Sequence, residues 1–489
     1  MAPPLPAPTP TPPLDADQER ALKRLLWLVA VGFFMQTLDA TIVNTALPAM
    51  ARSLGESPLR MQSVVVAYSL AMAMLIPASG WMADRFGTRR VYIAAIVLFV
   101  VGSVLCAMSS SLTMLVAARV AQGLGGALLL PVGRLVVLRT FPRERFLQAM
   151  SFVAIPGLVG PLIGPTLGGW LVEVASWHWI FLINLPVGII GALATLRWMP
   201  APPAMARVRF DLGGYLLLAF GMVALSLALD GLSGLGLRQA SVLVLMIFGL
   251  ASLVAYWLHA LRRPDPLFSP QLFRVGSLRI GLLGNLFSRL GSSCMPFLIP
   301  LLLQVTMGYS PVQAGMMMLP VALASMSMKR ITTPLIQRHG YRRVLVVNTA
   351  LVGLTMASFA LSSPQQPLSL LILQLALFGA VNSMQFTAMN TLTLKDLGPG
   401  AASSGNSLLS MVQMLAMGMG VAAAGAVLAA FTEFFGSAAG GSQALQAFQA
   451  TFACMALITL ASAGIFWQLA AADSRAEPAN KEQDVPEAG

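Results

Sequence analysis

The sequence predicts an all-α polytopic membrane protein built from about fourteen transmembrane helices. Hydrophobic residues make up 57% of the 489 residues and charged residues only 10%, too few to solvate a soluble protein of this size. Apolar runs of about 20 residues, the length that spans a bilayer, recur from Leu25 to Ala471. The Lys and Arg residues lie mostly in the short gaps between these runs. Lipid is therefore the expected solvent for most of the chain.

Polar and Gly/Pro clusters divide the apolar runs into the predicted helices. Six are expected at 25–47, 62–82, 91–111, 112–138, 148–172 and 178–199. Two more are expected at 212–230 and 240–261. A last set is expected at 278–304, 311–331, 343–362, 366–394, 404–430 and 447–471.

Basic residues alternate between successive loops as this helix count requires. One side of the predicted bundle receives nearly all of them, and the other receives only Arg52, Arg60 and Arg238. Cytoplasmic loops of membrane proteins carry the excess of Lys and Arg. We therefore expect a multi-pass protein of the bacterial inner membrane with both termini in the cytoplasm.

Two short basic loops point to an internal repeat. Residues 84–90 (DRFGTRR) and residues 337–343 (QRHGYRR) are identical at four of seven positions and follow the second and tenth predicted helices. Chance similarity between short basic loops is the alternative. If the loops are equivalent, the chain forms two six-helix halves with two inserted central helices. The predicted units are a disordered cytoplasmic tail (1–24), an N-terminal half (25–199), an inserted helix pair (200–277), a C-terminal half (278–471) and a second cytoplasmic tail (472–489).

Several functions are disfavoured by composition. The formal charge of +12 is spread over loops, which is a topology signal and gives no reason to expect nucleic acid as a partner. Cys106, Cys294 and Cys454 are isolated in apolar stretches, so we expect no metal site and no cofactor. The chain has no G-x-x-x-x-G-K-[ST] loop for ATP and no long loops for paired catalytic acids, so an enzyme is not expected.

Five stretches of the sequence are similar to those of one known family. They are residues 38–48 (LDATIVNTALP), 80–90 (GWMADRFGTRR), 119–126 (RVAQGLGG), 157–169 (GLVGPLIGPTLGG) and 177–188 (WHWIFLINLPVG). In these stretches the chain resembles the fourteen-span drug:proton antiporters of the major facilitator superfamily. The resemblance covers nearly the whole chain apart from its two tails. It implies the major facilitator fold and a proton-coupled exporter of small molecules, active in multidrug efflux and antibiotic resistance.

The loop after the second predicted helix matches the superfamily's loop signature. In it Gly80 permits close approach of helices, Gly87 permits a tight turn, and Asp84 can pair with an Arg or cap a neighbouring helix. Such contacts would hold the cytoplasmic side shut as a latch, whereas a plain positive-inside loop would explain only the arginines. The predicted latch comprises Gly80, Asp84, Arg85, Gly87, Arg89 and Arg90.

One carboxylate and one guanidinium are predicted to meet inside the membrane. Arg119 lies well within the fourth predicted helix, where an unpartnered Arg costs at least ~2.5 kcal/mol. Asp39 lies at a similar depth in the first helix. Because burial raises the pKa of a carboxyl and a nearby Arg lowers it, Asp39 is our candidate for the proton-coupling group, with Arg119 as its partner. A permanent structural ion pair is the alternative.

Glycines recur in the fifth predicted helix. Gly160, Gly164 and Gly168 are spaced by four residues, which predicts a smooth ridge for close packing against another helix. The prolines between them should bend the helix. Both a plain packing face and a tight outer seal fit this pattern. The full motif comprises Gly157, Gly160, Pro161, Gly164, Pro165, Gly168 and Gly169.

Scattered polar residues on apolar helices are candidates for a substrate cavity. Bonds between helices are the alternative for each of them. Methionines such as those at 316–318 suit a soft pocket, but ordinary lipid-facing positions are the favoured explanation for them. The cavity candidates are Asn44, Gln122, Arg134, Asn285, Arg289, Asn382 and Gln385.

Other functional interpretations stay open. Arg119, Arg134 and Arg289 would suit an exporter of an anionic metabolite or metal chelate, such as an organic acid. A membrane sensor or scaffold is a further alternative. The sequence does not identify the substrate, nor an outer-envelope adaptor protein.

Overall fold

Every regular element of the described residues is helical. A computed structural model describes residues 16–140, 143–200, 210–231, 239–397, 399–435 and 442–469. Within these ranges, twelve helical segments are long and apolar enough to cross a membrane. Two further apolar helices, α6 (Arg143–Val174) and α9 (Leu212–Gly231), bring the bundle to fourteen. The chain is an all-α polytopic membrane protein, as the sequence predicts.

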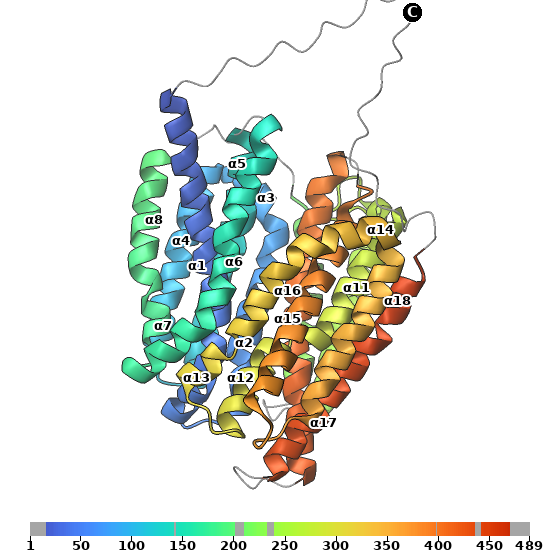
Figure 1. Cartoon of the computed structure of the whole chain (residues 1–489). Coiled ribbons are helices and arrows are strands. Elements are labelled where there is room, and N and C mark those ends of the chain that lie inside the picture. The colour runs from blue at the N-terminus through green and yellow to red at the C-terminus, as the bar shows by residue number, and fades with distance from the viewer. Residues whose placement is uncertain are drawn as a thin grey trace, which may run out of the picture.

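The first helix group, α1–α8, forms one side of the molecule (Figure 1). The segment η1 joins α1 to α2, and η2 joins α2 to α3. The group consists of α1 (Ala16–Leu54), η1 (Pro58–Met61), α2 (Gln62–Leu75), η2 (Ile76–Ala78), α3 (Ser79–Phe86), α4 (Thr88–Ala107), α5 (Leu112–Thr140), α6, α7 (Trp179–Leu182) and α8 (Asn184–Trp198).

The second helix group, α11–α18, lies beside the first (Figure 1). It follows the short helix η3 (Pro270–Arg274). The group consists of α11 (Gly276–Ser292), α12 (Met295–Val305), α13 (Pro311–Met316), α14 (Leu319–Ser358), η4 (Phe359–Leu361), α15 (Leu368–Leu394), α16 (Pro399–Phe435), α17 (Ser442–Ala461) and α18 (Ala463–Trp467).

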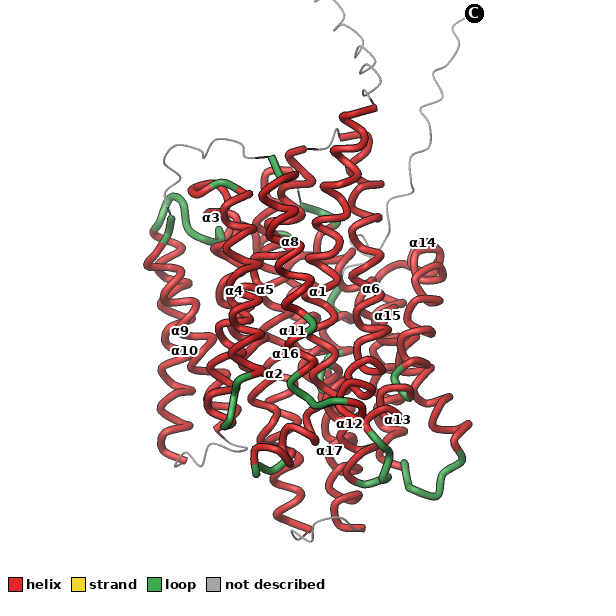
Figure 2. The backbone as a smooth tube through the Cα atoms, turned by 90° about the vertical axis from the view of Figure 1, so that its left-hand side faces the viewer, coloured by secondary structure: helices red, strands yellow, loops and turns green. Residues whose placement is uncertain are grey.

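Between the two groups in sequence, α9 and α10 (Gln239–Arg262) pack on each other at one edge of the bundle (Figure 2). Ser252 donates a hydrogen bond to the carbonyl of Leu217, which ties the two helices together (2.7 Å). The outward face of α10 is apolar and exposed, with Leu243 58% and Phe248 59% accessible. Such a face on a membrane-spanning helix is suited to contact with lipid. The division at residues 199 and 277 stays a prediction.

Helix α1 is longer than expected. We placed its start at Leu25 and its end near Leu47, but it runs from Ala16 to Leu54. Ion pairs one turn apart, Asp17–Arg20 (2.8 Å) and Glu19–Lys23 (3.5 Å), support the polar first turns. The predicted disordered tail at residues 1–24 is therefore too long, because residues 16–24 belong to α1. Residues 1–15 and the predicted tail at 472–489 lie outside the described residues.

The internal repeat is visible in backbone geometry. Gly87 has φ 86° and ψ 140°, and Gly340, at the matching position of the second basic loop, has φ 76° and ψ 160°. These positive φ values favour glycine. Gly340 divides α14 into two helices, so the predicted break between the tenth and eleventh spans is present. Both loops lie at the end where α1 begins, which we call the terminal end; the other is the opposite end (Figure 1).

Candidate functional site

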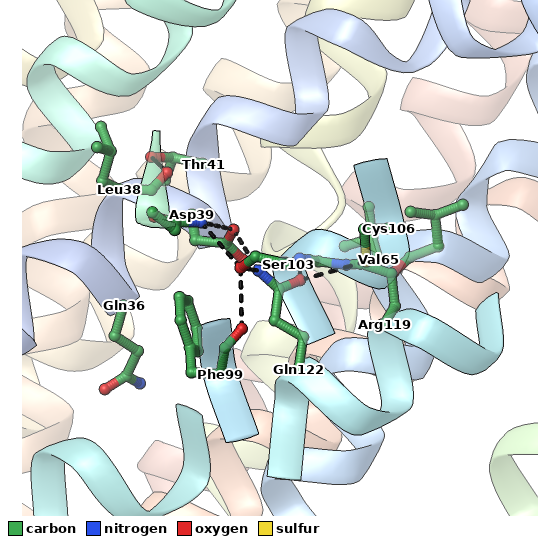
Figure 3. Close-up of polar contacts among 12 residues, drawn as sticks. Gln36, Leu38, Asp39, Thr41, Val65, Phe99, Ser103, Cys106, Arg119 and Gln122 are labelled. Atoms are coloured by element: carbon green, nitrogen blue, oxygen red, sulfur yellow. Dashed lines mark hydrogen bonds and ion pairs between the residues drawn. The ribbon is translucent and has the colours of Figure 1, made fainter. Parts of the chain in front are cut away.

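The carboxylate of Asp39 is fully buried within the first helix group, where side chains of α5 and α8 bond to it and Ser103 of α4 lies next to them (Figure 3). Arg119 on α5 pairs with Asp39 Oδ2 at 2.7 Å. On Oδ1, Gln122 donates a hydrogen bond at 2.7 Å and Asn184 at the start of α8 donates one at 3.0 Å. Ser103 on α4 accepts further bonds from Gln122 (2.8 Å) and Asn184 (3.3 Å). We call Asp39, Ser103, Arg119, Gln122 and Asn184 the Asp39 network.

The guanidinium of Arg119 uses several faces. It is 1% exposed, and its Nε donates to the carbonyl of Val64 on α2 at 3.2 Å. Its Nη1 also donates to Gln122 Oε1 at 2.6 Å, and its Cζ lies 4.1 Å from the Tyr68 ring centroid. A charge pair this deep is stable only when hydrogen bonds satisfy it fully. The meeting of Asp39 and Arg119 expected from their depths is thus present.

Two members of the Asp39 network were missed by sequence reasoning. Asn184 lies in the 177–188 stretch, but we did not select it as a site residue. Ser103 is a small polar residue within the apolar helix α4. Neither has a charge or a periodic pattern to mark it. The usable signal was the cost of a buried side-chain amide at Asn184, which needs a partner.

A cavity of about 180 Å³ lies between the two helix groups. Thr41 and Asn44 line it from α1, and Pro165 lines it from α6. The Asn44 Oδ1 atom is buried without a hydrogen-bond partner among the described residues, so a bound molecule can use it. The second group contributes mainly apolar side chains: Pro296, Pro300, Met318, Val321, Ala322, Ser325 and Met326.

Of the cavity candidates, Asn44 lines this space, whereas Gln122 and Gln385 serve bonds between helices. Gln122 belongs to the Asp39 network. Gln385 donates to Thr349 Oγ1 at 2.7 Å and accepts from Asn348 at 2.8 Å, which joins α15 to α14. For these two glutamines the structure favours the alternative reading. Asn382 is half-buried.

The remaining cavity candidates are Asn285, Arg289 and Arg134. Arg289 donates to Asn285 Oδ1 at 3.2 Å and lies 4.5 Å from the Phe386 ring, with no carboxylate contact among the described residues. Its Nη2 and the Nε of Arg134 are buried without partners there. The methionines at 316–318 divide between environments, because Met318 lines the cavity and Met316 is 47% exposed.

The glycine ridge of α6 packs against threonines of α1. A Cβ atom at Gly160 would lie 2.5 Å from Thr37 Oγ1, and one at Gly168 would lie 2.7 Å from Thr45 Oγ1. A Cβ at Gly164 would overlap Thr41 Oγ1. Hydrogen bonds run along the same line, from Thr41 to the Gly160 carbonyl (3.5 Å) and from Thr45 to the Pro165 carbonyl (3.2 Å). Each ridge glycine therefore lies close to a threonine, and the three threonines are spaced by the same four residues. A Cβ at Gly168 would also lie 2.6 Å from the Ile42 carbonyl oxygen.

Toward the opposite end, α6 meets the second helix group through bare backbone. A Cβ at Gly169 would overlap the Pro311 carbonyl on α13, and one at Gly315 would overlap the Pro165 carbonyl on α6. Thr166 donates to the Gly315 carbonyl at 3.3 Å. We call this α6–α13 contact the glycine seam. Gly157 and Pro161 are also on α6, but their surroundings lie outside the described residues.

The predicted latch differs from expectation. Asp84 pairs with Arg139 on α5, and Arg89 donates to the Leu196 carbonyl on α8, so both contacts stay within the first helix group. They do not bridge the two groups as a latch must. A Cβ at Gly80 meets no atom within 4 Å, so our reason for that glycine was wrong. Arg85 and Arg90 are exposed.

Comparison with known proteins identifies the family of the chain. The family model described as "Major Facilitator Superfamily" matches residues 29–421. "Putative multidrug resistance protein MdtD" of Serratia proteamaculans is 53% identical over 434 residues, covering 88% of this chain and 90% of that protein. The protein of the same name from Pectobacterium carotovorum is 52% identical over 441 residues, covering 90% and 94%.

Solved structures agree on the fold. The "peptide transporter POT in complex with sulfate" superposes with a TM-score of 0.69 at 14% identity, over 94% of this chain and 99% of that one. A second POT family transporter gives 0.67 at 16% identity, over 91% and 95%. At such identities these structures show the fold alone.

The chain belongs to the Major Facilitator Superfamily. It is a multi-pass membrane transporter of small molecules, similar to multidrug resistance transporters.

Proposed function

We propose that this transporter is a proton-coupled exporter in which Asp39 carries the proton. The observation behind the proposal is the Asp39 network. Asp39 and Asp211 are the two buried carboxylates among the described residues, and Asp211 lies outside the spans. An exporter driven by protons needs a group inside the membrane whose charge changes, and Asp39 meets that need.

Helix α1 connects the proton site to the cavity. Asp39 bonds to α5 and α8, whereas Thr41 and Asn44 on the same helix line the cavity. Protonation of Asp39 removes the negative partner of Arg119 and weakens the pair. The Asp39 network then rearranges and α1 shifts against α6. The proton and the substrate thus act on one helix from two sides.

We propose that the protein lies in the inner membrane of a bacterial cell and that its terminal end faces the cytoplasm. The Arg-rich turns at Gly87 and Gly340 lie at this end, and Lys and Arg concentrate on cytoplasmic loops. Contacts at the glycine seam close the opposite end. We propose on this basis that the arrangement is an inward-facing state of the transport cycle, which takes substrate from the cytoplasm.

Apolar, drug-like compounds are the proposed substrates. Proline, methionine, valine and alanine side chains dominate the cavity, and a lining of this kind accepts varied apolar shapes. An anionic metabolite or metal chelate is the second candidate, favoured by Arg289, whose charge meets no carboxylate among the described residues.

Transport into inverted membrane vesicles tests the proposal. A panel of apolar and anionic compounds is offered with and without a proton gradient. The Asp39→Asn variant keeps the side-chain volume but cannot cycle a proton, so gradient-driven uptake should vanish at normal protein level. Asp265→Asn, which removes an exposed carboxylate, is the matched control and should transport normally. Full gradient-driven uptake by Asp39→Asn would discard the proposal, and uptake of no compound by the unaltered protein would favour a sensor.

A further inference from the structure

A second cavity, of about 620 Å³, opens at the terminal end where α10 leads through η3 into α11. His259 near the end of α10 bonds to Asp211 just before α9 (2.8 Å), so the end of the α10 span lies beside the start of α9. The cavity lies well away from the Asp39 network in sequence and on different helices. Its lining includes Trp257, Leu261, Arg263, Gln271, Phe273, Arg274 and Arg279.

The lining is strongly basic. Arg263, Arg274 and Arg279 contribute three guanidinium groups, and the lining residues include no carboxylate. Arg263 Nε lies 3.6 Å from Asp211 Oδ1, the same oxygen that contacts His259. Asp211 is not part of the cavity lining. The side chains of Arg274 and Arg279 are exposed and have no ion pair or hydrogen bond among the described contacts. The cavity lining therefore carries a net positive charge, which suits an anionic ligand.

An apolar surface continues from the cavity along α10. Trp257 is 41% exposed, Leu258 50%, Leu261 58% and Val254 59%. The Trp257 ring packs edge-on against Phe273, with ring centroids 5.4 Å apart. Tryptophan concentrates where the bilayer meets water, because its ring is apolar and its N–H is polar. The cavity thus combines a cationic chamber at the surface with an apolar wall that descends into the membrane.

We propose that this cavity binds the headgroup of an anionic phospholipid, with its acyl chains along α10. Basic pockets between transmembrane helices are suited to phosphate headgroups, and each Arg near the surface strengthens the attraction by about fivefold. The phosphate contacts Arg274 and Arg279, and Arg263 approaches it from α10. A lipid held this way joins the end of α10 to the start of α11, and so ties the α9–α10 pair to the second helix group.

Native mass spectrometry of the purified full-length protein tests the proposal. Phosphatidylglycerol, phosphatidylcholine and inorganic phosphate are titrated separately. We expect retention of phosphatidylglycerol in preference to phosphatidylcholine. The Arg274→Gln/Arg279→Gln variant should bind it on the order of 25-fold more weakly. The control, Arg338→Gln/Arg343→Gln, removes two exposed charges at the Gly340 turn of the same end and should bind normally.

A second measurement locates the lipid and guards against misfolding. Photoreactive phosphatidylglycerol should crosslink to peptides within residues 254–279 in the unaltered protein and in the control, and much less in the cavity variant. All three proteins should give the same thermal unfolding profile. Equal lipid binding by cavity variant and control, or competition by inorganic phosphate alone at similar concentration, would overturn the proposal. Because neither readout uses transport, the outcome is independent of the proposed function.

Discussion

The carboxylate of Asp39 and the side-chain amide of Gln122 lie 2.7 Å apart, and the same amide accepts a hydrogen bond from Arg119 at 2.6 Å. Asp39, Arg119 and Gln122 therefore each contact the other two, and Gln122 bridges the buried ion pair. Both ends of its side chain are used, and its orientation is fixed by the charges that it joins. A change at Gln122 thus alters the surroundings of both charges while leaving both in place.

The first prediction concerns this residue. Gln122→Leu removes a hydrogen bond from each charge and should cost about 1–3 kcal/mol of stability, with fewer substrate molecules exported per proton. Gln385→Leu is the matched control, since Gln385 is equally buried and bonds only to neutral groups. Gln385→Leu should lower stability without changing the ratio of substrate molecules exported to protons imported. The ratio is measured in proteoliposomes, from substrate flux beside proton flux. Equal ratios in the two variants would assign Gln122 a purely structural role.

The second prediction concerns Asp84 and Arg139. Their side chains are 26% and 30% exposed, so we expect Asp84→Asn to cost no more than about 1 kcal/mol of stability. Turnover should fall, because the pair fixes α3 against α5 beside the Gly87 turn. The charge-swapped variant Asp84→Arg/Arg139→Asp should recover most of the turnover. If the swap is as slow as the single variant, the pair itself does not set the rate.

The third prediction concerns the contact between α6 and α1. Gly164→Leu places a four-carbon side chain where Thr41 already lies, and overpacking of this kind costs about 1–3 kcal/mol or more. The helices should separate, with proton leak and loss of coupling in proteoliposomes. Gly464→Leu is the control, because a Cβ there meets no atom within 4 Å. Tight, fully coupled transport by Gly164→Leu would show that this contact is not required during the cycle.

The fourth prediction fills the cavity between the helix groups. Ala322→Phe adds a ring to a space of about 180 Å³, so uptake of the larger compounds in a panel should fall before uptake of the smaller ones. The same substitution at the lipid-facing Ala251 of α10 should have no effect. Competition between compounds of graded size supplies the measurement. A uniform decrease for all sizes would place the binding site elsewhere.

The fifth prediction concerns pH and the carboxylate of Asp211. Burial acts to raise its pKa, but the hydrogen bonds from His259 and from the amides of Gly214 and Leu267 prevail and lower the pKa of Asp211. The ionised form is the one stabilised. Its contribution is complete above the unfolded pKa of about 3.9 and is lost as the pH falls through the lower folded value. Asp211→Asn should lower the melting temperature at pH 7 and lose that difference in strong acid. A difference that persists below pH 2 would contradict this assignment.

Much of the fold is predictable because membrane helices are dictated by length and hydropathy. The alternation of basic loops indicated the helix number, and the depths of Asp39 and Arg119 indicated their meeting. Asn184 was missed because its role depends on how α8 turns against α4, which no local pattern records. The interpretation of Gly80 was wrong for a related reason. A glycine in the sequence allows another helix to approach closely, but only the packed structure shows whether a helix lies there.

The glycine seam has a thermodynamic consequence. Where Gly169 meets Pro311 and Gly315 meets Pro165, the atoms in close contact are main-chain atoms. The side chains of Thr166 and Glu173 also bond across the seam, so few side chains are ordered there. An interface of long side chains would lose rotamer entropy at each closure, roughly 0.5–2 kcal/mol for each side chain immobilised. The seam avoids most of that loss. If the seam is the gate that we propose, it can open and close with little ordering of side chains.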